Sequence, residues 1–203
     1  MIKIDKLLLR TQYQALRKLN PTNKECDQKI AQNVMNLINS HYIAKYANAS
    51  HLESLSVGLY YPMAGEPDIR FLFNHFKNIS FPKINGSHMD FIAVKDPTDI
   101  RILKFNKFKT LEPVIGDIVE PNILLVPGLV FDMYGGRVGM GQGCYDQYIT
   151  AHFNRIECTI GVCYNYQIIQ NRSQQIATEP HDQKMDYMIS ESGVCHAVED
   201  IFG

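Results

Sequence analysis

The stretch ILLVPGLVFDMYGGRVGMGQGCYDQY, residues 123–148, decides the fold of this chain. It opens with an apolar run, Ile123 to Val126, which predicts a strand buried on both faces. A glycine-rich loop follows, and Cys144, Tyr145 and Tyr148 then fit the start of a helix. This order predicts an anion site, because glycines let backbone N–H groups approach a phosphate and a helix N-terminus adds positive charge. The glycines of this loop are Gly135, Gly136, Gly139, Gly141 and Gly143.

Three known motifs do not account for the loop. No Lys-Ser or Lys-Thr follows the glycines, which excludes a Walker A sequence. The spacing Gly139-x-Gly141-x-Gly143 does not meet the dinucleotide fingerprint, and no GxSxG nucleophile elbow occurs in the chain. What remains is a phosphate cradle that contains Arg137, with a tight surface turn as the alternative interpretation.

Composition limits the class of protein. The 203 residues are 45% hydrophobic, which permits one sizeable core, and we expect a single domain over 1–203. A net charge of −1 predicts no general attraction to nucleic acid or to a membrane surface. No apolar run is long enough to span a bilayer, and the N-terminal apolar run is too short for a secretory signal. The cysteines are odd in number and lack CxxC spacing, so we expect the reducing cytoplasm.

Hydrophobic periodicity predicts how the remaining elements are ordered. We expect one helix over 3–19 and a second that begins at a capping box of Thr22 and Glu25 and ends at about residue 47. A third helix should begin at Pro67, and a fourth should cover 144–154. Strands are predicted over 57–62, 79–84, 89–94, 157–164 and 187–190, and Asn85-Gly86 predicts a hairpin between the second and third. Residues 167–170 read as a short helical turn, and 193–202 as a weak helix or tail.

The alternation of strands and helices predicts an α/β fold. We expect a single three-layer α/β/α domain with a mainly parallel, Rossmann-like sheet. Residues 96–119 are polar and irregular, and we expect an excursion from the sheet in which Phe105 and Phe108 anchor the segment or face a ligand.

Cations gather on one side of the first predicted helix. Lys6, Arg10 and Arg17 stand at positions i, i+4 and i+11, which stack on one face. A solvated basic face is one interpretation, and a face that leans over an anionic ligand is the other.

Three carboxylates are candidates for the same chemistry. Glu66 sits between the end of a strand and the start of a helix, where ligands bind in open α/β sheets, although it could simply favour the helix dipole. Asp146, in the first turn after the glycine loop, could hold Mg²⁺ against bound phosphates or compensate the dipole, and Asp182 could be a second ligand or a solvated loop residue. Cys144 is interpreted as a lining residue, because no partner base can be named for a nucleophile.

These residues resemble a known family. The stretch LLVPGLVFDMYGGRVGMGQGCYDQYI is similar to the signature of 5-formyltetrahydrofolate cyclo-ligases, also called 5,10-methenyltetrahydrofolate synthetases. The resemblance extends over most of the chain. It includes the spacing of Lys6 and Arg10, the segment that ends in Glu66, the pair Glu112-Pro113, and the pair His181-Asp182. It implies ATP-dependent conversion of 5-formyltetrahydrofolate to 5,10-methenyltetrahydrofolate, with release of ADP and phosphate.

The resemblance also implies roles for individual residues. Arg137 and Lys6 would be catalytic, Asp146 and Asp182 would bind Mg²⁺, and Glu66 would bind the pterin ring with Tyr61 nearby. ATP would contact Lys6, Arg10, Arg137, Val138, Gly139, Met140, Gly141, Gln142, Gly143, Cys144 and Tyr145. The folate would contact Tyr61, Glu66, Met140, Gly141, Gln142, Gly143 and Cys144. We expect a monomer without nucleic-acid or membrane partners.

The chain departs from the signature at two positions and leaves two other functions open. Cys144 stands where the family usually has an aromatic residue, and Met140 replaces a residue that is often aromatic or basic. A non-catalytic nucleotide- or folate-binding protein on the same fold is one alternative. A sugar-phosphate isomerase-like enzyme that uses the glycine loop for a substrate phosphate is the other.

Overall fold

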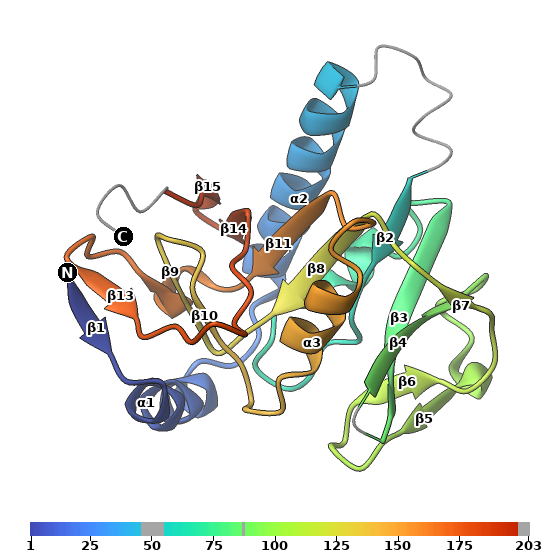
Figure 1. Ribbon diagram of the computed structural model, residues 1–203. Coiled ribbons are helices and arrows are strands. Elements are labelled where there is room, and N and C mark those ends of the chain that lie inside the picture. Colours follow the sequence, from blue (N-terminus) through green and yellow to red (C-terminus); the bar gives the residue numbers. More distant parts are fainter. Residues whose placement is uncertain (46–54, 87, 199–203) are drawn as a thin grey trace.

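A computed structural model describes residues 1–45, 55–86 and 88–198. Its centre is an eight-stranded sheet in the order β15-β14-β11-β8-β2-β3-β4-β7 (Figure 1). The strands β14, β11, β8, β2 and β3 run parallel, whereas β15, β4 and β7 pair antiparallel at the two edges. These strands are β2 (Ser56–Gly58), β3 (Asn78–Asn85), β4 (His88–Ala93), β7 (Ile118–Val119), β8 (Ile123–Pro127), β11 (Cys158–Val162), β14 (Tyr187–Ser190) and β15 (Gly193–His196).

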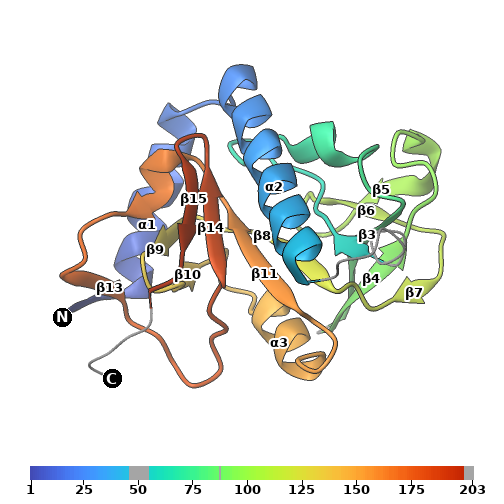
Figure 2. The same ribbon diagram turned by 90° about the horizontal axis from the view of Figure 1, so that it is seen from above.

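Strand β8 is buried on both of its faces, as its continuous apolar run predicts. Ile123 and Leu125 pack with α2 (Lys24–Lys45), whereas Leu124 and Val126 pack on the other face with α3 (Cys144–Ala151). Figure 2 shows the two helices on opposite sides of β8 and β11. The predicted α/β class with a mainly parallel centre is therefore confirmed, while the regular three-layer arrangement and the single-domain organisation stay predictions.

A three-stranded sheet, in the order β10-β9-β12, shares the α3 face. Its strands are β9 (Val130–Asp132), β10 (Arg137–Val138) and β12 (Ile168–Ile169). Phe131 of β9 packs directly over Gly161 of β11, where an added Cβ would lie 2.5 Å from the Phe131 ring. Glycine at position 161 is thus what lets this sheet, which carries Arg137, approach the main sheet closely.

The N-terminal strand pairs with a strand from the last quarter of the chain beside this sheet. Strand β1 (Ile2–Ile4) runs parallel to β13 (Gln174–Ile176), and α1 (Lys6–Leu19) follows directly. Asp5 caps α1, because its carboxylate accepts hydrogen bonds from the backbone N–H groups of Leu7 and Leu8. The predicted helix over 3–19 is thus correct for α1, except that residues 2–4 form a strand.

Several element predictions need correction. The cap of α2 is Asn23 rather than Thr22, since the Asn23 side chain accepts from the N–H groups of Glu25 and Cys26. The helix predicted after Pro67 is a 3₁₀ turn, η2 (Ile69–Leu72), and the turn predicted at 167–170 is η4 (Asn165–Gln167) followed by β12. Residues 193–196 form β15 rather than a helix or tail, because they complete the sheet edge beside β14.

Three further elements are shorter than the hydrophobic patterns suggest. The ladder of β2 ends at Gly58, β11 covers 158–162, and α3 ends at Ala151. The β3–β4 hairpin is confirmed by the pairing of Asn85 with His88. The predicted end of the second helix, at about residue 47, lies outside the described residues.

The excursion at 96–119 contains more structure than its polar sequence suggests. It forms η3 (Ile100–Ile102), the antiparallel pair β5 (Leu103–Phe105) and β6 (Leu111–Pro113), and the edge strand β7. Within the ranges 1–45, 55–86 and 88–198, none of the helices is both long and apolar enough to cross a lipid bilayer.

Candidate active site

A cavity of about 1150 Å³ opens between α1, the glycine loop and the β3–β4 hairpin. This volume is at the upper end of the range usual for ligand sites, so there is room for a nucleotide and a second substrate. Every residue predicted to bind ATP, folate or Mg²⁺ lines it. They are Lys6, Arg10, Tyr61, Glu66, Arg137, Val138, Gly139, Met140, Gly141, Gln142, Gly143, Cys144, Tyr145, Asp146 and Asp182.

The glycine loop forms one wall and ends at the N-terminus of α3. Gly141 and Gly143 have φ values of +93° and +66°, a left-handed backbone that favours glycine. Gly143 is the N-cap of α3 and supplies no side-chain acceptor to its first turn. The wall therefore offers an uncapped helix end to an anion, as the strand–loop–helix pattern predicts.

A buried carboxylate that sequence reasoning overlooked organises this loop. Asp132, at the end of β9, accepts hydrogen bonds through Oδ1 from the N–H groups of Tyr134 (2.9 Å) and Gly136 (2.8 Å). Its Oδ2 accepts from the N–H of Ile176 at 2.7 Å. Asp132 thus ties the start of the glycine loop to the segment that leads to Asp182. The pairing was not foreseeable, because it joins positions that are distant in sequence.

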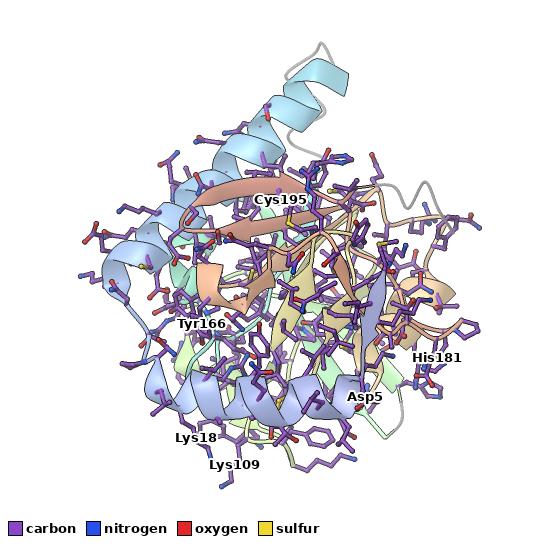
Figure 3. All side chains as sticks on the ribbon, turned by 90° about the vertical axis from the view of Figure 1, so that its left-hand side faces the viewer. Asp5, Lys18, Lys109, Tyr166, His181 and Cys195 are labelled. Atoms are coloured by element: carbon purple, nitrogen blue, oxygen red, sulfur yellow. The ribbon has the colours of Figure 1, made fainter. Side chains whose placement is uncertain are left out.

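The cationic face of α1 lies against the cavity rather than in solvent. Lys6, Arg10 and Arg17 all line it. Arg10 donates from Nε to the carbonyl of Gly139 at 3.1 Å, which holds the glycine loop against the helix. Figure 3 shows Asp5 at the start of α1 on the same side of the molecule as His181, and Lys18 pointing outward near the other end.

Lys6 pairs with the polar loop after β13. Its ammonium forms ion pairs with Asp182 and with Glu179, the latter at 3.1 Å. Burial alone would lower the pKa of Lys6, but hydrogen bonds to these two carboxylates outweigh it and raise the pKa. Burial likewise opposes ionisation of Asp182, yet the N–H of Glu179 and the Lys6 ammonium lower its pKa. Both groups therefore remain charged around neutral pH.

Arg137 and Asp146 form a second ion pair across the base of the loop. Nη2 of Arg137 lies 3.0 Å from Oδ2 of Asp146, and Oδ1 of Asp146 accepts from the N–H of Gln183 at 3.1 Å. The guanidinium carbon also lies 5.6 Å from the ring centre of Tyr145. The Nε of Arg137 and the hydroxyl of Tyr145 are buried without a hydrogen-bond partner, so polar groups remain available beside the cavity.

Potential metal ligands gather at one end of the cavity. Ligand atoms of Glu179, His181 and Asp182 lie within 4.8 Å of one another. Asp146 is not part of this group, although its bond to Gln183 places it beside the same loop. The carboxylates suit Mg²⁺, which prefers oxygen ligands and is commonly bound by carboxylates together with phosphate oxygens. The imidazole of His181 is not a ligand type that Mg²⁺ prefers.

Glu66 lies deep in the cavity and is 5% exposed. Oε2 accepts from the N–H of Met63 at 2.9 Å, and Oε1 lies 3.4 Å from Nη1 of Arg17. Burial raises the pKa of Glu66, and Arg17 opposes that shift. The 3₁₀ turn that follows is capped by Asp68, and the Glu66 carboxylate accepts from Met63 instead of from that turn.

Aromatic and apolar groups complete the wall opposite α1. Tyr61 is buried, stacks on Phe81 with ring centres 4.2 Å apart, and donates its hydroxyl to the carbonyl of Pro97. Phe108 of the excursion lines the cavity, whereas Phe105 is 72% exposed. The turn that presents Phe108 is held by Asn106, whose side chain accepts from the N–H groups of Phe108 and Thr110.

Cys144 also lines the cavity at the start of α3. Burial raises the pKa of its thiol, which keeps the sulfur protonated and unreactive at neutral pH. The geometry supports the interpretation of Cys144 as a lining residue rather than a nucleophile.

Comparison with known proteins agrees with this arrangement. Residues 3–191 match the model of the 5-formyltetrahydrofolate cyclo-ligase family. A probable 5-formyltetrahydrofolate cyclo-ligase of Schizosaccharomyces pombe is 31% identical over 135 residues, which cover 58% of this chain and 63% of that protein. The 5-formyltetrahydrofolate cyclo-ligase of Mus musculus is 26% identical over 159 residues, which cover 72% of this chain and 76% of the relative.

A solved structure shows the same fold. The 5,10-methenyltetrahydrofolate synthetase of Aquifex aeolicus superposes with a TM-score of 0.68 at 25% identity, covering 96% of this chain and 93% of the other. The family match spans both the glycine loop and the remote segments that carry Lys6, Glu66 and Asp182. The chain therefore belongs to the 5-formyltetrahydrofolate cyclo-ligase family.

Proposed function

We propose that the protein converts 5-formyltetrahydrofolate to 5,10-methenyltetrahydrofolate with ATP, releasing ADP and phosphate. One observation supports this most directly. The cations Lys6, Arg10 and Arg137, the glycine loop and the buried Glu66 face one cavity that is large enough for both substrates. A single bound phosphate would not need cations from both α1 and β10 together with an acidic cluster at Asp182.

In the ATP half of the proposed site, charge is neutralised from two directions. Lys6 and Arg10 approach from α1, and Arg137 approaches from β10. Backbone N–H groups from Val138 to Tyr145 would surround the phosphates, and Met140, Gln142 and Cys144 would line the path between the two substrates. Phosphoryl transfer requires such positioning and charge neutralisation rather than a protein nucleophile.

Mg²⁺ is part of the proposal as a partner of ATP. Asp182 and Asp146 would hold it, and Glu179 stands beside Asp182 as a further oxygen ligand. Bound there, the ion supplies positive charge to the phosphate oxygens. Lys6 would then exchange its present pairing with Asp182 for a contact with the phosphates.

In the folate half of the proposed site, Glu66 would receive the pterin ring, with Tyr61 and Phe108 as flat walls. An ionised carboxylate accepts the two hydrogen bonds that the ring's N–H and amino groups donate.

The chemistry then proceeds in two balanced steps. The formyl oxygen attacks the γ-phosphorus and ADP leaves. The N10 amine next attacks the activated formyl carbon and loses its proton to solvent, and the formyl oxygen departs with the phosphate as the methenyl bridge forms. Arg137 and Lys6 would stabilise the charge that spreads over the transferred phosphoryl group.

A coupled assay tests this function. The purified protein is mixed with 5-formyltetrahydrofolate, ATP and Mg²⁺, and the near-ultraviolet absorbance of the methenyl product is followed together with ADP release. Product that requires all three components supports the proposal. Ligand-induced thermal stabilisation without product would favour the non-catalytic binding protein instead. We further propose that the protein is a monomer. We also propose the cytoplasm as its location, since no disulfide joins the cysteines within residues 1–45, 55–86 and 88–198.

A further inference from the structure

The third cation of α1, Arg17, does not reach toward the phosphate cradle. Its Nη1 lies 3.4 Å from Oε1 of Glu66, and its Nη2 donates to the carbonyl of Gly128 at 2.9 Å. Both charged side chains are largely buried, with 12% of Arg17 and 7% of Glu66 exposed. The helix that supplies two cations to the ATP half therefore also sends one into the floor of the folate half.

The chain around Glu66 is shaped to the stem of this arginine. Gly65 has a φ of +77°, and a Cβ on it would lie 2.3 Å from Cγ of Arg17. The Gly128 carbonyl that receives Arg17 is fixed in turn by Gln167, whose Nε2 donates to it at 2.9 Å. The stem of Arg17 is thus fixed by Gly65 and its guanidinium by the Gly128 carbonyl, and this directs the guanidinium toward Glu66.

The surroundings of Glu66 contain one formal charge that favours its ionised form. Arg17 arrives from α1, the Met63 N–H arrives from the same turn, and Tyr60 and Tyr145 lie near from the β2 and α3 sides. Burial raises the pKa of both tyrosines, which keeps them neutral. Without Arg17, burial would act on Glu66 opposed only by the Met63 N–H.

The charge on Glu66 matters for the ring that it would receive. Only an ionised carboxylate accepts on both oxygens, whereas a protonated one turns one oxygen into a donor. A ring edge with two adjacent N–H donors therefore binds the ionised carboxylate. The protonated carboxyl group binds that edge less well, because its hydroxyl places a donor opposite a donor.

We propose that Arg17 is a positioning residue that keeps the Glu66 carboxylate charged and oriented to accept two hydrogen bonds from the aminopyrimidinone edge of the folate. This inference rests on the proposed function, because it assigns the folate ring to Glu66. Arg17 itself contacts neither the reacting formyl group nor the phosphates.

The test compares Arg17→Met with wild type across pH 5.5 to 9, measuring KM for 5-formyltetrahydrofolate, KM for ATP and kcat. The folate KM should rise roughly 10- to 100-fold at the acid end, because a charged hydrogen-bond pair is lost. The increase should shrink as pH rises, since loss of Arg17 raises the pKa of Glu66 and higher pH restores its charge. The ATP KM should stay within about twofold of wild type, because a local change in the folate half leaves the contacts to ATP unaltered.

Two further variants sharpen the result. Lys18→Met removes an exposed cation next along α1 and should leave the folate KM and its pH dependence unchanged. Arg17→Lys keeps the charge and should restore part of the low-pH affinity. A folate KM raised by the same factor at every pH, or a parallel rise in the ATP KM, would overturn the proposal in favour of a general packing role.

A measurement without turnover separates this inference from the proposed function. The side-chain carboxyl carbon of Glu66 is titrated by NMR in the ligand-free protein and identified by its loss in Glu66→Gln. The midpoint should be higher in Arg17→Met than in wild type, and Arg17→Gln, which also removes the charge, is measured in case the methionine variant does not fold. Equal midpoints would refute the role of Arg17 even if the enzyme is active. A shifted midpoint in a protein that makes no methenyl product would refute only the proposed function.

Discussion

Nη2 of Arg137 lies 3.0 Å from Oδ2 of Asp146, so the cation of the glycine loop is anchored to the first turn of the helix that follows the loop. The pair is largely buried, with 6% of the arginine and 16% of the aspartate side chain exposed. This contact joins the residue predicted to bind phosphate to a residue predicted to bind Mg²⁺.

Replacing Arg137 by alanine should reduce kcat/KM for ATP by about 100-fold, because one charge that stabilises the transferred phosphoryl group is lost. The KM for ATP should rise, whereas the KM for 5-formyltetrahydrofolate should change little. Steady-state kinetics with each substrate varied in turn measures both effects. Arg101→Ala, which removes an exposed arginine on the excursion, is the matched control. Normal ATP kinetics in the Arg137 variant would remove this residue from the site.

Replacing Asp146 by asparagine should raise the Mg²⁺ concentration needed for half-maximal activity by about tenfold or more, since one negatively charged oxygen ligand becomes neutral. A Mg²⁺ titration at saturating ATP measures this shift. Far-ultraviolet circular dichroism checks the fold, and Glu25→Gln on the exposed face of α2 serves as the control. An unfolded variant would instead support a helix-stabilising role for Asp146.

Replacing Asp132 by asparagine should lower the free energy of unfolding by about 3 kcal/mol, because the amide removes an acceptor that a buried N–H group needs. For a chain of this size, the loss corresponds to a decrease in Tm of about 6–12 °C. Thermal unfolding measures it, with the exposed Asp117→Asn as the control. A variant as stable as wild type would show that the three hydrogen bonds of Asp132 contribute little.

The ion pair of Lys6 with Asp182 should make the free energy of unfolding depend on pH in the acid range. The pKa of Asp182 is lowered, so its contribution is present above about pH 4 and is lost as pH falls through the folded-state value. The pKa of Lys6 is raised, so its contribution persists until pH rises through that higher value. Lys6→Met should therefore cost up to about 1 kcal/mol at pH 7 and progressively less as the pH falls below the folded-state pKa of Asp182.

Urea unfolding at pH 7, 5 and 3 measures that dependence. Lys24→Met, at the exposed start of α2, is the control that removes a surface cation. A destabilisation of Lys6→Met that is equal at pH 7 and pH 3 would mean that the packing of the lysine stem, not its charge, stabilises the fold.

The ligand-facing groups were predictable to the extent that they carry local signals. The apolar run of β8, the glycine spacing and the stacked Lys6 and Arg10 each express a period or a loop chemistry. The glycine loop, Lys6 and Arg10 line the cavity, and β8 reaches it at Pro127. The α/β class followed from the same patterns.

What could not be predicted depends on contacts between distant segments. The hydrogen bond from the Ile176 N–H to Asp132, the pairing of Arg17 with Glu66, and the ion pair of Lys6 with Asp182 exist only once distant segments of the chain meet. The cap at Asn23 was missed for a different reason, since Thr22 and Asn23 are both good caps and the backbone geometry decides between them. The strand at 193–196 was missed because an edge strand needs only a partner, and its own hydrophobic pattern is weak.

The parallel pairing of Ile2–Ile4 with Gln174–Ile176 has a consequence for how the protein comes into being. Strand β1 is synthesised long before β13, the strand with which it pairs. Lys6 and Asp182 come together only at that late stage, after the strands of the central sheet up to β11 are available. Contacts between segments so far apart slow folding, so the ion pair of Lys6 with Asp182 would form after much of the central sheet.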